Sequence, residues 1–434
     1  MTSKKIRKIF AAILISQATL LTAVCQTKPK TTSSDAVKDA TTLPQIINAD
    51  KMPTFQINAQ DLPQPYASES AMRNSSVVAQ PKDAKLVVPK GFKVNVFAEG
   101  DFRYPRWMTL APNGDVFVAD SRANSIIILR DKNKDGAISA DERFVFADNL
   151  SQPFGMAFNA DWFYVANTDA VVRFKYKSGQ TKAEGAAEKI IELTEGGYNQ
   201  HWTRNILFSP DGKKLYVSIG SSGNVDIEKD ERRAGISEYN PDGSGYKLFA
   251  SGLRNPIGLA WNPANNQLWT AVNERDGLGD DLVPDYVTSV KDGGFYGFPY
   301  YYLGMNKDPR RKEQVKLAAA PIVPDVLVTS HSAALGIQFY TGEMFPAEYR
   351  GDAFVALHGS WNREKLTGYK IIRVNFENGK PVSNGYEDFV SGWLPSESSQ
   401  QVWGRPVGLL VNSDGSLLIA DDGGKKIWRV SYQK

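Results

Sequence analysis

The sequence contains little of three things: cysteine, histidine and long helical patterns. Its one cysteine in 434 residues excludes a disulfide within the chain. Its three histidines leave few candidates for proton transfer near neutral pH. The scarcity of helical periods, together with 36 glycines and 23 prolines, indicates many short strands joined by turns.

Positive charge is concentrated at the N-terminus. Lys4, Lys5, Arg7 and Lys8 precede an apolar run, residues 9–24, which is too short and too one-sided in its flanking charge for a membrane span. This pattern predicts an export signal over residues 1–25. Without those four charges the formal net charge of +3 becomes −1, so nucleic-acid binding loses its main electrostatic support.

The single cysteine, Cys25, ends the predicted signal, where a bacterial lipoprotein signal places the residue that is lipidated. Thr22 and Val24 depart from what such signals prefer, so ordinary cleavage near Cys25 stays open as an alternative. We expect an exported protein, in the periplasm or at the outer membrane, that touches a membrane only through such an anchor. Residues 26–87, rich in Ser, Thr, Pro, Ala and Gln, predict a tether and an extended arm.

From residue 88 onward the sequence is periodic. Each unit has a motif often containing proline and glycine, then an apolar strand, a turn and a second apolar strand, and the first four units lie about 50 residues apart. One such unit cannot bury its faces alone, whereas a closed ring buries them all. The sequence therefore predicts an all-β fold, a six-bladed β-propeller over residues 88–434. The strand at 92–97 would complete the last blade beside 427–432.

A propeller brings together the loops that lead into its innermost strands. His201, Arg204, Arg254, Asn255 and Arg405 all stand at such positions, so we expect them to converge at one end of the channel. His201 could act as a base or could cap a buried loop. The arginines offer fixed positive forks that suit an anionic planar ligand, although an ion pair between blades is the alternative for each.

A candidate calcium loop follows the first strand pair of the repeat. Asp131, Asn133, Asp135 and Glu142 have the spacing of calcium ligands, and Gly136 stands at the bend. Strand signals replace the helices of an EF-hand on both sides, so the pattern predicts a calcium-stabilised hairpin with a structural role, or else a polar turn. The acidic, glycine-rich residues 273–281 form a second candidate cation loop, with a solvated acidic loop as the alternative.

Five motifs, taken in order along the repeat, resemble the sorbosone dehydrogenase branch of the soluble PQQ-dependent sugar dehydrogenases. The resemblance covers roughly residues 89–432. The motifs are Gln-His-Trp-Thr-Arg-Asn at 200–205, Gly-Leu-Arg-Asn-Pro at 252–256, Asn-Glu-Arg-Asp-Gly at 273–277, His-Gly-Ser-Trp-Asn-Arg at 358–363 and Gly-Arg-Pro-Val-Gly at 404–408.

This resemblance implies an enzyme that binds pyrroloquinoline quinone (PQQ) and Ca²⁺ and oxidises an aldose or a keto-aldehyde such as sorbosone to its lactone or acid. It implies that His201 takes the proton of the sugar hydroxyl while hydride goes to the quinone, and that Arg254 stabilises the reduced quinone. Asn255, Arg204 and Arg405 would bind the cofactor as well. Electrons would pass on to an acceptor in the membrane.

The resemblance also implies that backbone oxygens of Asp276 and Gly277 face the cofactor calcium. Here the sequence departs from the family, because the glucose-oxidising branch has Gly-Pro at these two positions. The family's cofactor lysine has no clear counterpart either, and Arg363 and Lys365 are the nearest basic residues.

Two other functions remain open from the sequence. The same fold could carry a calcium-dependent sugar lactonase, which would need Ca²⁺ held in the channel by side-chain carboxylates. It could also be a non-catalytic surface binding propeller. His331 and His358 could line the site or cap loops in any of these proteins.

Overall fold

A computed structural model of the protein describes residues 43–194 and 201–433. The predicted export signal, the beginning of the predicted tether and Gln200 of the first motif lie outside these residues. No helix in the part that is described is long and apolar enough to cross a membrane.

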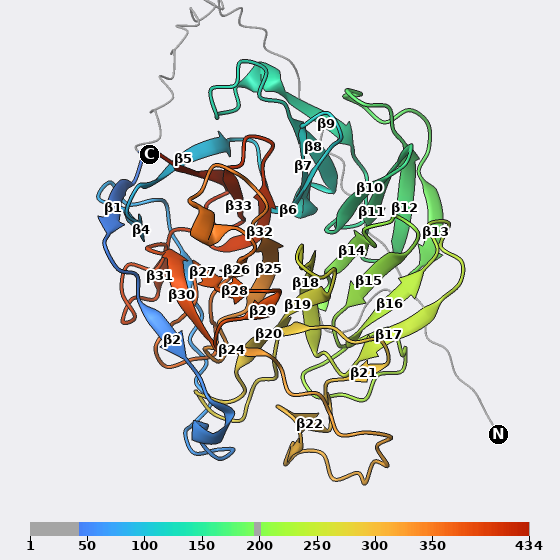
Figure 1. The fold of residues 1–434 in the computed structure, drawn as a ribbon, viewed down its shortest axis with the longest axis vertical. Coiled ribbons are helices and arrows are strands. Elements are labelled where there is room, and N and C mark those ends of the chain that lie inside the picture. The colour runs from blue at the N-terminus through green and yellow to red at the C-terminus, as the bar shows by residue number, and fades with distance from the viewer. Residues whose placement is uncertain (1–42, 195–200, 434) are drawn as a thin grey trace, which may run out of the picture. The chain divides into compact units, whose positions relative to one another are not determined.

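Six four-stranded antiparallel units follow one another around a ring (Figure 1). The first three blades are continuous in sequence. They consist of β6 (Pro105–Leu110), β7 (Val116–Asp120), β8 (Ser125–Leu129) and β9 (Arg143–Ala147); β10 (Met156–Asn159), β11 (Trp162–Ala166), β12 (Ala170–Lys175) and β13 (Glu188–Glu192); and β14 (Arg204–Phe208), β15 (Leu215–Ile219), β16 (Gly235–Tyr239) and β17 (Lys247–Ser251).

The last three blades carry insertions or borrow strands from elsewhere in the chain. They consist of β18 (Asn255–Trp261), β19 (Leu268–Asn273), β20 (Asp285–Ser289) and β24 (Val326–Val328); β25 (Ala334–Phe339), β26 (Ala353–Leu357), β27 (Lys370–Val374) and β30 (Gly385–Val390); and β32 (Pro406–Val411), β33 (Leu417–Asp421), β34 (Lys426–Tyr432) and β5 (Phe92–Glu99).

The ring is closed by strands from the two ends of the propeller, residues 88–434. β5 pairs antiparallel with β34, from Phe92 opposite Tyr432 to Glu99 opposite Lys426. This pairing confirms both the six-bladed all-β propeller and the strand that completes its last blade.

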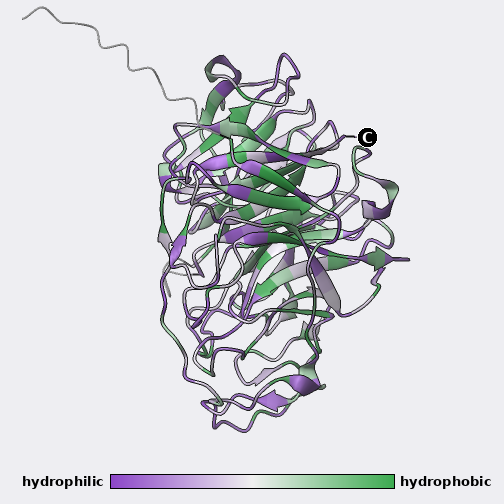
Figure 2. Ribbon diagram, turned by 90° about the vertical axis from the view of Figure 1, so that its left-hand side faces the viewer, coloured by the Kyte–Doolittle hydropathy of each residue, from purple (hydrophilic) through white to green (hydrophobic). Residues whose placement is uncertain are grey.

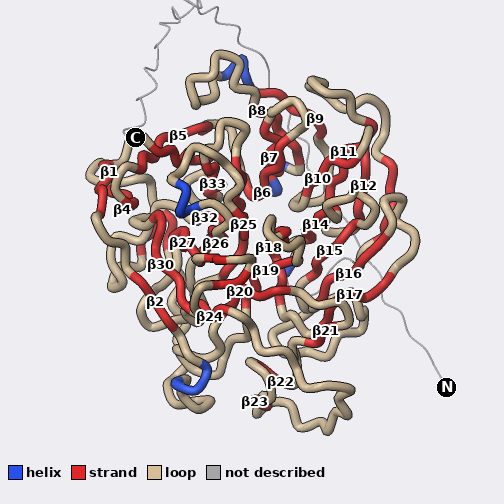
Figure 3. The backbone as a smooth tube through the Cα atoms, viewed as in Figure 1, coloured by secondary structure: helices blue, strands red, loops and turns tan. Residues whose placement is uncertain are grey.

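The arm and the insertions add short elements outside the blades (Figure 3). β2 adds an outer strand to the fifth blade, β21 pairs with β17, and β1 and β3 pair in parallel with β4 and β31. These elements are β1 (Gln45–Ala49), β2 (Thr54–Gln56), β3 (Ser76–Val77), β4 (Lys85–Pro89), β21 (Gly294–Phe295), β22 (Tyr301–Tyr302), β23 (Asn306–Lys307), β28 (Phe376–Glu377), β29 (Lys380–Pro381), β31 (Gln401–Val402), and the 3₁₀ turns η1 (Ala59–Asp61), η2 (Ser121–Ala123), η3 (Ala140–Glu142) and η5 (Ala347–Tyr349).

Apolar side chains fill the spaces between neighbouring blades. Between the first two blades, the ring of Phe117 lies 4.9–5.2 Å, centroid to centroid, from those of Phe146, Phe158 and Phe163. Figure 2 shows hydrophobic residues along the strands and hydrophilic residues in the surrounding loops. The alternation that predicts strands in the sequence is thus also what joins each blade to the next.

The repeated glycines let neighbouring inner strands approach closely. A methyl group on Gly408 in β32 would lie 2.5 Å from the carbonyl oxygen of Arg106 in β6. Equivalent additions at Gly155, Gly258 and Gly336 would lie 2.3–2.6 Å from atoms of the next blade. Real Cβ atoms do not come so close, so glycine is the residue that fits where the inner strands meet.

Adding a methyl group at this contact is therefore expected to destabilise the ring. We expect Gly408→Ala to lower the free energy of unfolding by about 1–3 kcal/mol or more, because backbone must move to admit the side chain. Gly100→Ala is the control, because Gly100 has a φ of +76° but nothing within 4 Å of an added Cβ. We expect this variant to lose only about 1 kcal/mol of the free energy of unfolding. Urea unfolding measures both, and equal losses would contradict the close-packing explanation.

Candidate active site

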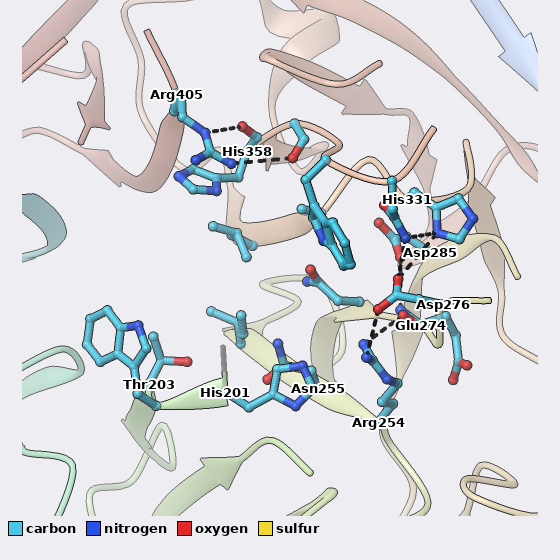
Figure 4. Close-up of a pocket in the computed structure, with 18 of the residues that line it drawn as sticks. His201, Thr203, Arg254, Asn255, Glu274, Asp276, Asp285, His331, His358 and Arg405 are labelled. Carbon is cyan, nitrogen blue, oxygen red and sulfur yellow. Dashed lines mark hydrogen bonds and ion pairs between the residues drawn. The ribbon is translucent and has the colours of Figure 1, made fainter. Parts of the chain in front are cut away.

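Loops that lead into the inner strands line a pocket of about 330 Å³ at one end of the channel (Figure 4). The structure brings His201, Arg254, Asn255 and Arg405 together there, as their equivalent places in the repeat predict. All three histidines of the chain line the pocket. Its residues are Tyr104, Arg106, His201, Trp202, Thr203, Arg254, Asn255, Ile257, Asn273, Glu274, Asp276, Asp285, His331, Ala333, Leu335, His358, Gly359, Trp361, Asn362 and Arg405.

His201 precedes β14 and is held in one tautomer. Its Nδ1 lies 3.0 Å from the carbonyl oxygen of Ser221. A carbonyl oxygen can only accept, so Nδ1 carries the ring proton and Nε2 holds the basic lone pair. Burial, with the nearby charge of Arg254, lowers the pKa of His201 to about 3. The imidazole is therefore neutral near pH 7 and can accept a proton at Nε2.

Arg254 is fixed in position by several acceptors. Its Nη1 donates to the carbonyl oxygen of Glu274 at 2.7 Å, and its Nη2 donates to Asp276 Oδ2 at 3.2 Å. The next residue, Asn255, begins β18, and its Oδ1 is buried without a hydrogen-bond partner among the described residues. This oxygen is turned toward Gly220, where an added Cβ would lie 2.0 Å from it, so it is not open to a ligand in the pocket.

One side of the pocket combines a carboxylate, an imidazole and an amide. Asp276 Oδ1 accepts a hydrogen bond from Asn362 Nδ2 at 2.6 Å and lies 3.5 Å from His331 Nδ1. Burial alone would raise the pKa of Asp276, but Arg254, His331 and Asn362 outweigh it and lower the pKa. Burial alone would lower the pKa of His331, but Asp276 outweighs it and raises the pKa. With Trp361 beside them, these residues form what we call the Asp276 wall, comprising Asp276, His331, Trp361 and Asn362.

The Arg405 wall, comprising Arg106, His358 and Arg405, is positively charged. Asp422 lies beneath it, with both carboxylate oxygens 3.0 Å from His358 Nε2 and a salt bridge to Arg106. Burial, reinforced by Arg405, lowers the pKa of His358 to about 4. Within the described chain Arg405 forms no ion pair, and its guanidinium makes only long hydrogen bonds, 3.3 and 3.5 Å, to the carbonyl oxygens of His358 and Gly359. This guanidinium can therefore receive an anion.

Arg204 does not line the pocket with the other predicted residues. It begins β14 and is buried, and its Nη1 donates to the carbonyl oxygens of His201 and Thr203 at 3.0 and 3.1 Å. Its Nη2 donates to the carbonyl oxygen of Thr194 at 3.2 Å. The prediction of cofactor binding by Arg204 is therefore not supported; this side chain positions the loop that carries His201.

The backbone of Asp276 and Gly277 does not present calcium ligands to the pocket. The carbonyl oxygen of Asp276 accepts hydrogen bonds from Asn224 Nδ2 at 2.9 Å and Arg310 Nη1 at 2.6 Å. A guanidinium at that oxygen disfavours a cation by charge repulsion, and Gly277 is not among the lining residues. The carbonyl oxygen of Asp276 is thus occupied, and its side chain lines the pocket instead, so calcium binding by this backbone stays a prediction.

The basic residues considered for the missing lysine also lie elsewhere. Arg363 binds the carbonyl oxygen of Asp280 at 2.7 Å and the carboxylate of Asp281, and Lys365 lies 3.9 Å from Glu397. The pocket instead contains Arg106, the second residue of β6. Arg106 follows the repeat proline, Pro105, whereas Asn255 and Arg405 precede theirs, so equivalence along the repeat does not identify it.

The predicted structural calcium loop is a hairpin whose ligands are not assembled. β8 pairs with β9, which confirms the hairpin. The Glu142 carboxylate accepts hydrogen bonds from the backbone of Lys132 and Ser139 at 2.7 and 3.0 Å, and Asp131 accepts one from Gly136 at 3.0 Å. The described residues contain no group of three or more His, Cys, Asp or Glu side chains that could hold a metal ion. Calcium binding by Asp131, Asn133, Asp135 and Glu142 is therefore not supported.

Comparison with known proteins places the chain in a family. A model of the TrAA12-like family matches residues 86–291 and 309–433. The chain belongs to the TrAA12-like family. Residues 43–85 of the arm and 292–308 of the insertion lie outside the match.

Individual relatives share the fold at low identity. An uncharacterised protein of Borreliella burgdorferi is 29% identical over 369 residues, 83% of this chain and 94% of that protein. A PQQ-dependent pyranose dehydrogenase of Coprinopsis cinerea is 24% identical over 284 residues, 51% of this chain but only 38% of the relative's length. A solved structure of the Trichoderma reesei carbohydrate-active enzyme family AA12 is 20% identical with a TM-score of 0.70, covering 83% of this chain and 100% of that one.

The low pKa of His201 predicts a specific loss of stability in acid. An unfolded histidine, with a pKa near 6.5, binds a proton that the folded His201 excludes until about pH 3. The contribution of His201 to the free energy of unfolding is therefore fully present above pH 6.5. Below that pH it falls, by up to about 1.4 kcal/mol per pH unit. We expect His201→Gln to lose less stability than the wild type between pH 6.5 and 4, measured by urea unfolding.

His331→Gln is the matched control for this titration. The raised pKa of His331 contributes to the free energy of unfolding at low pH, and this contribution is lost as pH rises. Removing His331 therefore does not reduce the loss of stability between pH 6.5 and 4. Equal acid sensitivity of the wild type and His201→Gln would show that the pKa of His201 is not depressed.

The hairpin that carries Glu142 allows a test of the calcium prediction. Because this carboxylate pairs two backbone N–H groups, we expect Glu142→Ala to destabilise the calcium-free protein, on the order of 1 kcal/mol for each group left unpaired. The melting temperature in EDTA measures this loss. A rise in melting temperature on adding Ca²⁺ to the wild type, absent in Glu142→Gln, would reinstate the calcium loop.

Proposed function

We propose that this chain is a PQQ-dependent sugar dehydrogenase. The observation that carries the proposal is the pairing, in one pocket, of a neutral His201 in a fixed tautomer with Arg405, a guanidinium that has no carboxylate partner among the described residues. The first acts as a base and the second binds an anion. The family and the printed activity of the C. cinerea relative support this reading.

The pocket fits an anionic quinone in charge and hydrogen bonding. PQQ carries three carboxylates, and Arg405, with Arg106 on the same wall, offers planar donors suited to them. When bound, PQQ supplies the acceptor for the hydride that leaves the sugar.

The chain's own residues then perform the proton transfer. The sugar hydroxyl donates its proton to His201 Nε2, while Nδ1 keeps its own proton and donates a hydrogen bond to the Ser221 carbonyl oxygen, which holds the ring in orientation. A pKa of about 3 makes His201 a weak base in the protein alone. A bound tricarboxylate adds negative charge to the pocket and raises that pKa toward the range in which proton transfer is efficient.

The finer parts of the proposal concern substrate and cellular context. We propose an aldose or a keto-aldehyde such as sorbosone as the substrate, with its lactone or acid as the product, on the strength of the five ordered motifs. We also propose that the protein is exported, either lipidated at Cys25 or cleaved nearby, and that it passes electrons to a membrane acceptor. These points rest on the sequence.

Replacing the base tests the reaction. We expect His201→Gln to retain PQQ binding, followed by the absorbance of the quinone, and to lose turnover of sugars by about 10²-fold or more with an artificial electron acceptor. Wild-type rates in this variant would contradict the proposed role. Absence of PQQ binding by the wild type would reject the dehydrogenase, and lactone hydrolysis without PQQ would favour the lactonase.

Replacing the free arginine tests the anion site. We expect Arg405→Gln to weaken PQQ binding by about 10-fold to 100-fold, because a charge-assisted hydrogen bond is lost. Arg350→Gln, at an exposed arginine of the fifth blade that does not line the pocket, is the matched control. Equal binding by the two variants would place the cofactor away from the Arg405 wall.

A further inference from the structure

A segment of the N-terminal arm lies behind the Asp276 wall. We call residues 66–73 the strap; they lie outside the part of the chain that matches the family. The backbone N–H of Tyr66 donates to the carbonyl oxygen of Leu278 at 2.7 Å. Two strap hydroxyls accept from the same loop, Ser70 from Gly279 N at 3.1 Å and Ser68 from Asp280 N at 2.9 Å.

The peptide that the strap holds also holds a pocket histidine. The carbonyl oxygen of Gly279 lies 3.0 Å from His331 Nε2, which therefore donates to it. Gly279 has a φ of +122°, and an added Cβ would lie 3.0 Å from Ser68 Oγ and 3.2 Å from its carbonyl oxygen. The strap is thus packed directly on the backbone that orients His331.

The strap also holds the loop that carries the rest of the Asp276 wall. The backbone N–H of Arg73 donates to the carbonyl oxygen of Trp361 at 2.8 Å. Its guanidinium Nη1 donates to the backbone carbonyl oxygen of Glu364 at 2.7 Å. The two loops are joined to each other as well, because Glu364 N donates to Asp280 Oδ1 at 2.9 Å. Strap and loops therefore form one hydrogen-bonded junction behind the pocket.

The insertion secures the other flank of the same loop. Arg275 is fully buried, and its guanidinium binds Asp308 at 3.2 Å and the carbonyl oxygen of Tyr301 at 2.7 Å. Arg310 Nη1 donates to the carbonyl oxygen of Asp276 at 2.6 Å. Asp308 and Tyr301 belong to residues 292–308, the second stretch outside the family match.

The chemistry of the Asp276 wall suits a sugar more than an anion. Carboxylate, amide and imidazole groups pair with hydroxyls, and an aromatic ring offers a flat apolar face to the C–H groups of a sugar. A carboxylate repels the anion that Arg405 attracts on the opposite wall. The two walls therefore divide the pocket between a polyhydroxylated substrate and an anionic cofactor.

We propose that the strap is a specificity-determining element of this pocket: by fixing the Asp276 wall it sets the affinity for the sugar. The inference rests on the proposed function for the identity of the ligand, but the junction itself does not. Ser68, Ser70 and Arg73 act as positioning residues, since none of them lines the pocket.

The test compares two arm variants of the full chain. S68A/S70A/R73A removes the side-chain bonds to the loops, whereas the control, E69A/N74A, changes neighbouring exposed residues that have no hydrogen bond to either loop. We expect amide hydrogen exchange at 276–281 and 359–364 to be about tenfold faster in the first variant than in the second, without sugar or cofactor. Equal exchange rates in the two variants would overturn the proposal that the strap positions these loops.

Kinetics then separate positioning from general damage. We expect the first variant to raise KM for the sugar about fivefold to tenfold, with kcat, PQQ binding and the melting temperature close to those of the control. Faster exchange with an unchanged KM would overturn the specificity role. If the wild type binds PQQ but oxidises no sugar, the proposed function fails. The strap proposal is then tested by the amide hydrogen exchange rates and by the sugar affinity of the two variants, measured from tryptophan fluorescence.

Discussion

The close approach of six inner strands around the channel is the constraint on which the rest of the structure depends. Atoms of one blade, mostly backbone atoms, lie where a side chain of its neighbour would stand, so glycine recurs at Gly155, Gly258, Gly336 and Gly408. This contact draws the starts of the inner strands together. Residues far apart in sequence, such as Arg106 and Arg405, thereby come to share one pocket. The site is a consequence of how the ring is packed.

Charge compensation decides what that pocket can bind. Arg254 is paired with Asp276, and Arg106 with Asp422, so their charges are largely neutralised where they lie. Paired charges of this kind keep their geometry without demanding a ligand. Arg405 has no such partner within the described chain and is held only by long bonds to carbonyl oxygens. The attraction for an anion is therefore confined to one wall, while the opposite wall stays polar and close to neutral.

The fold and much of the site could be predicted from sequence because both follow from the repeat. Period, alternation and turn residues predict the blades, and equivalent places in them predict that His201, Arg254, Asn255 and Arg405 converge. The prediction failed for Arg204, because equivalence along the chain does not fix side-chain direction, and this guanidinium turns to the backbone of its own loop. Nor does the sequence reveal that Arg310, 34 residues later, donates a hydrogen bond to the carbonyl oxygen of Asp276. The contacts of the strap join segments that do not repeat, so no periodic pattern in the sequence predicts them.

The two stretches outside the family match, the arm and residues 292–308 of the insertion, both contact the loop that carries Asp276, the first through Ser70 and the second through Asp308. The residues of both walls lie within the family match, but the Asp276 wall is also held by residues outside that match. Such a division allows the two walls to evolve at different rates. A lineage can exchange the arm and so alter the Asp276 wall while the Arg405 wall remains under its original selection.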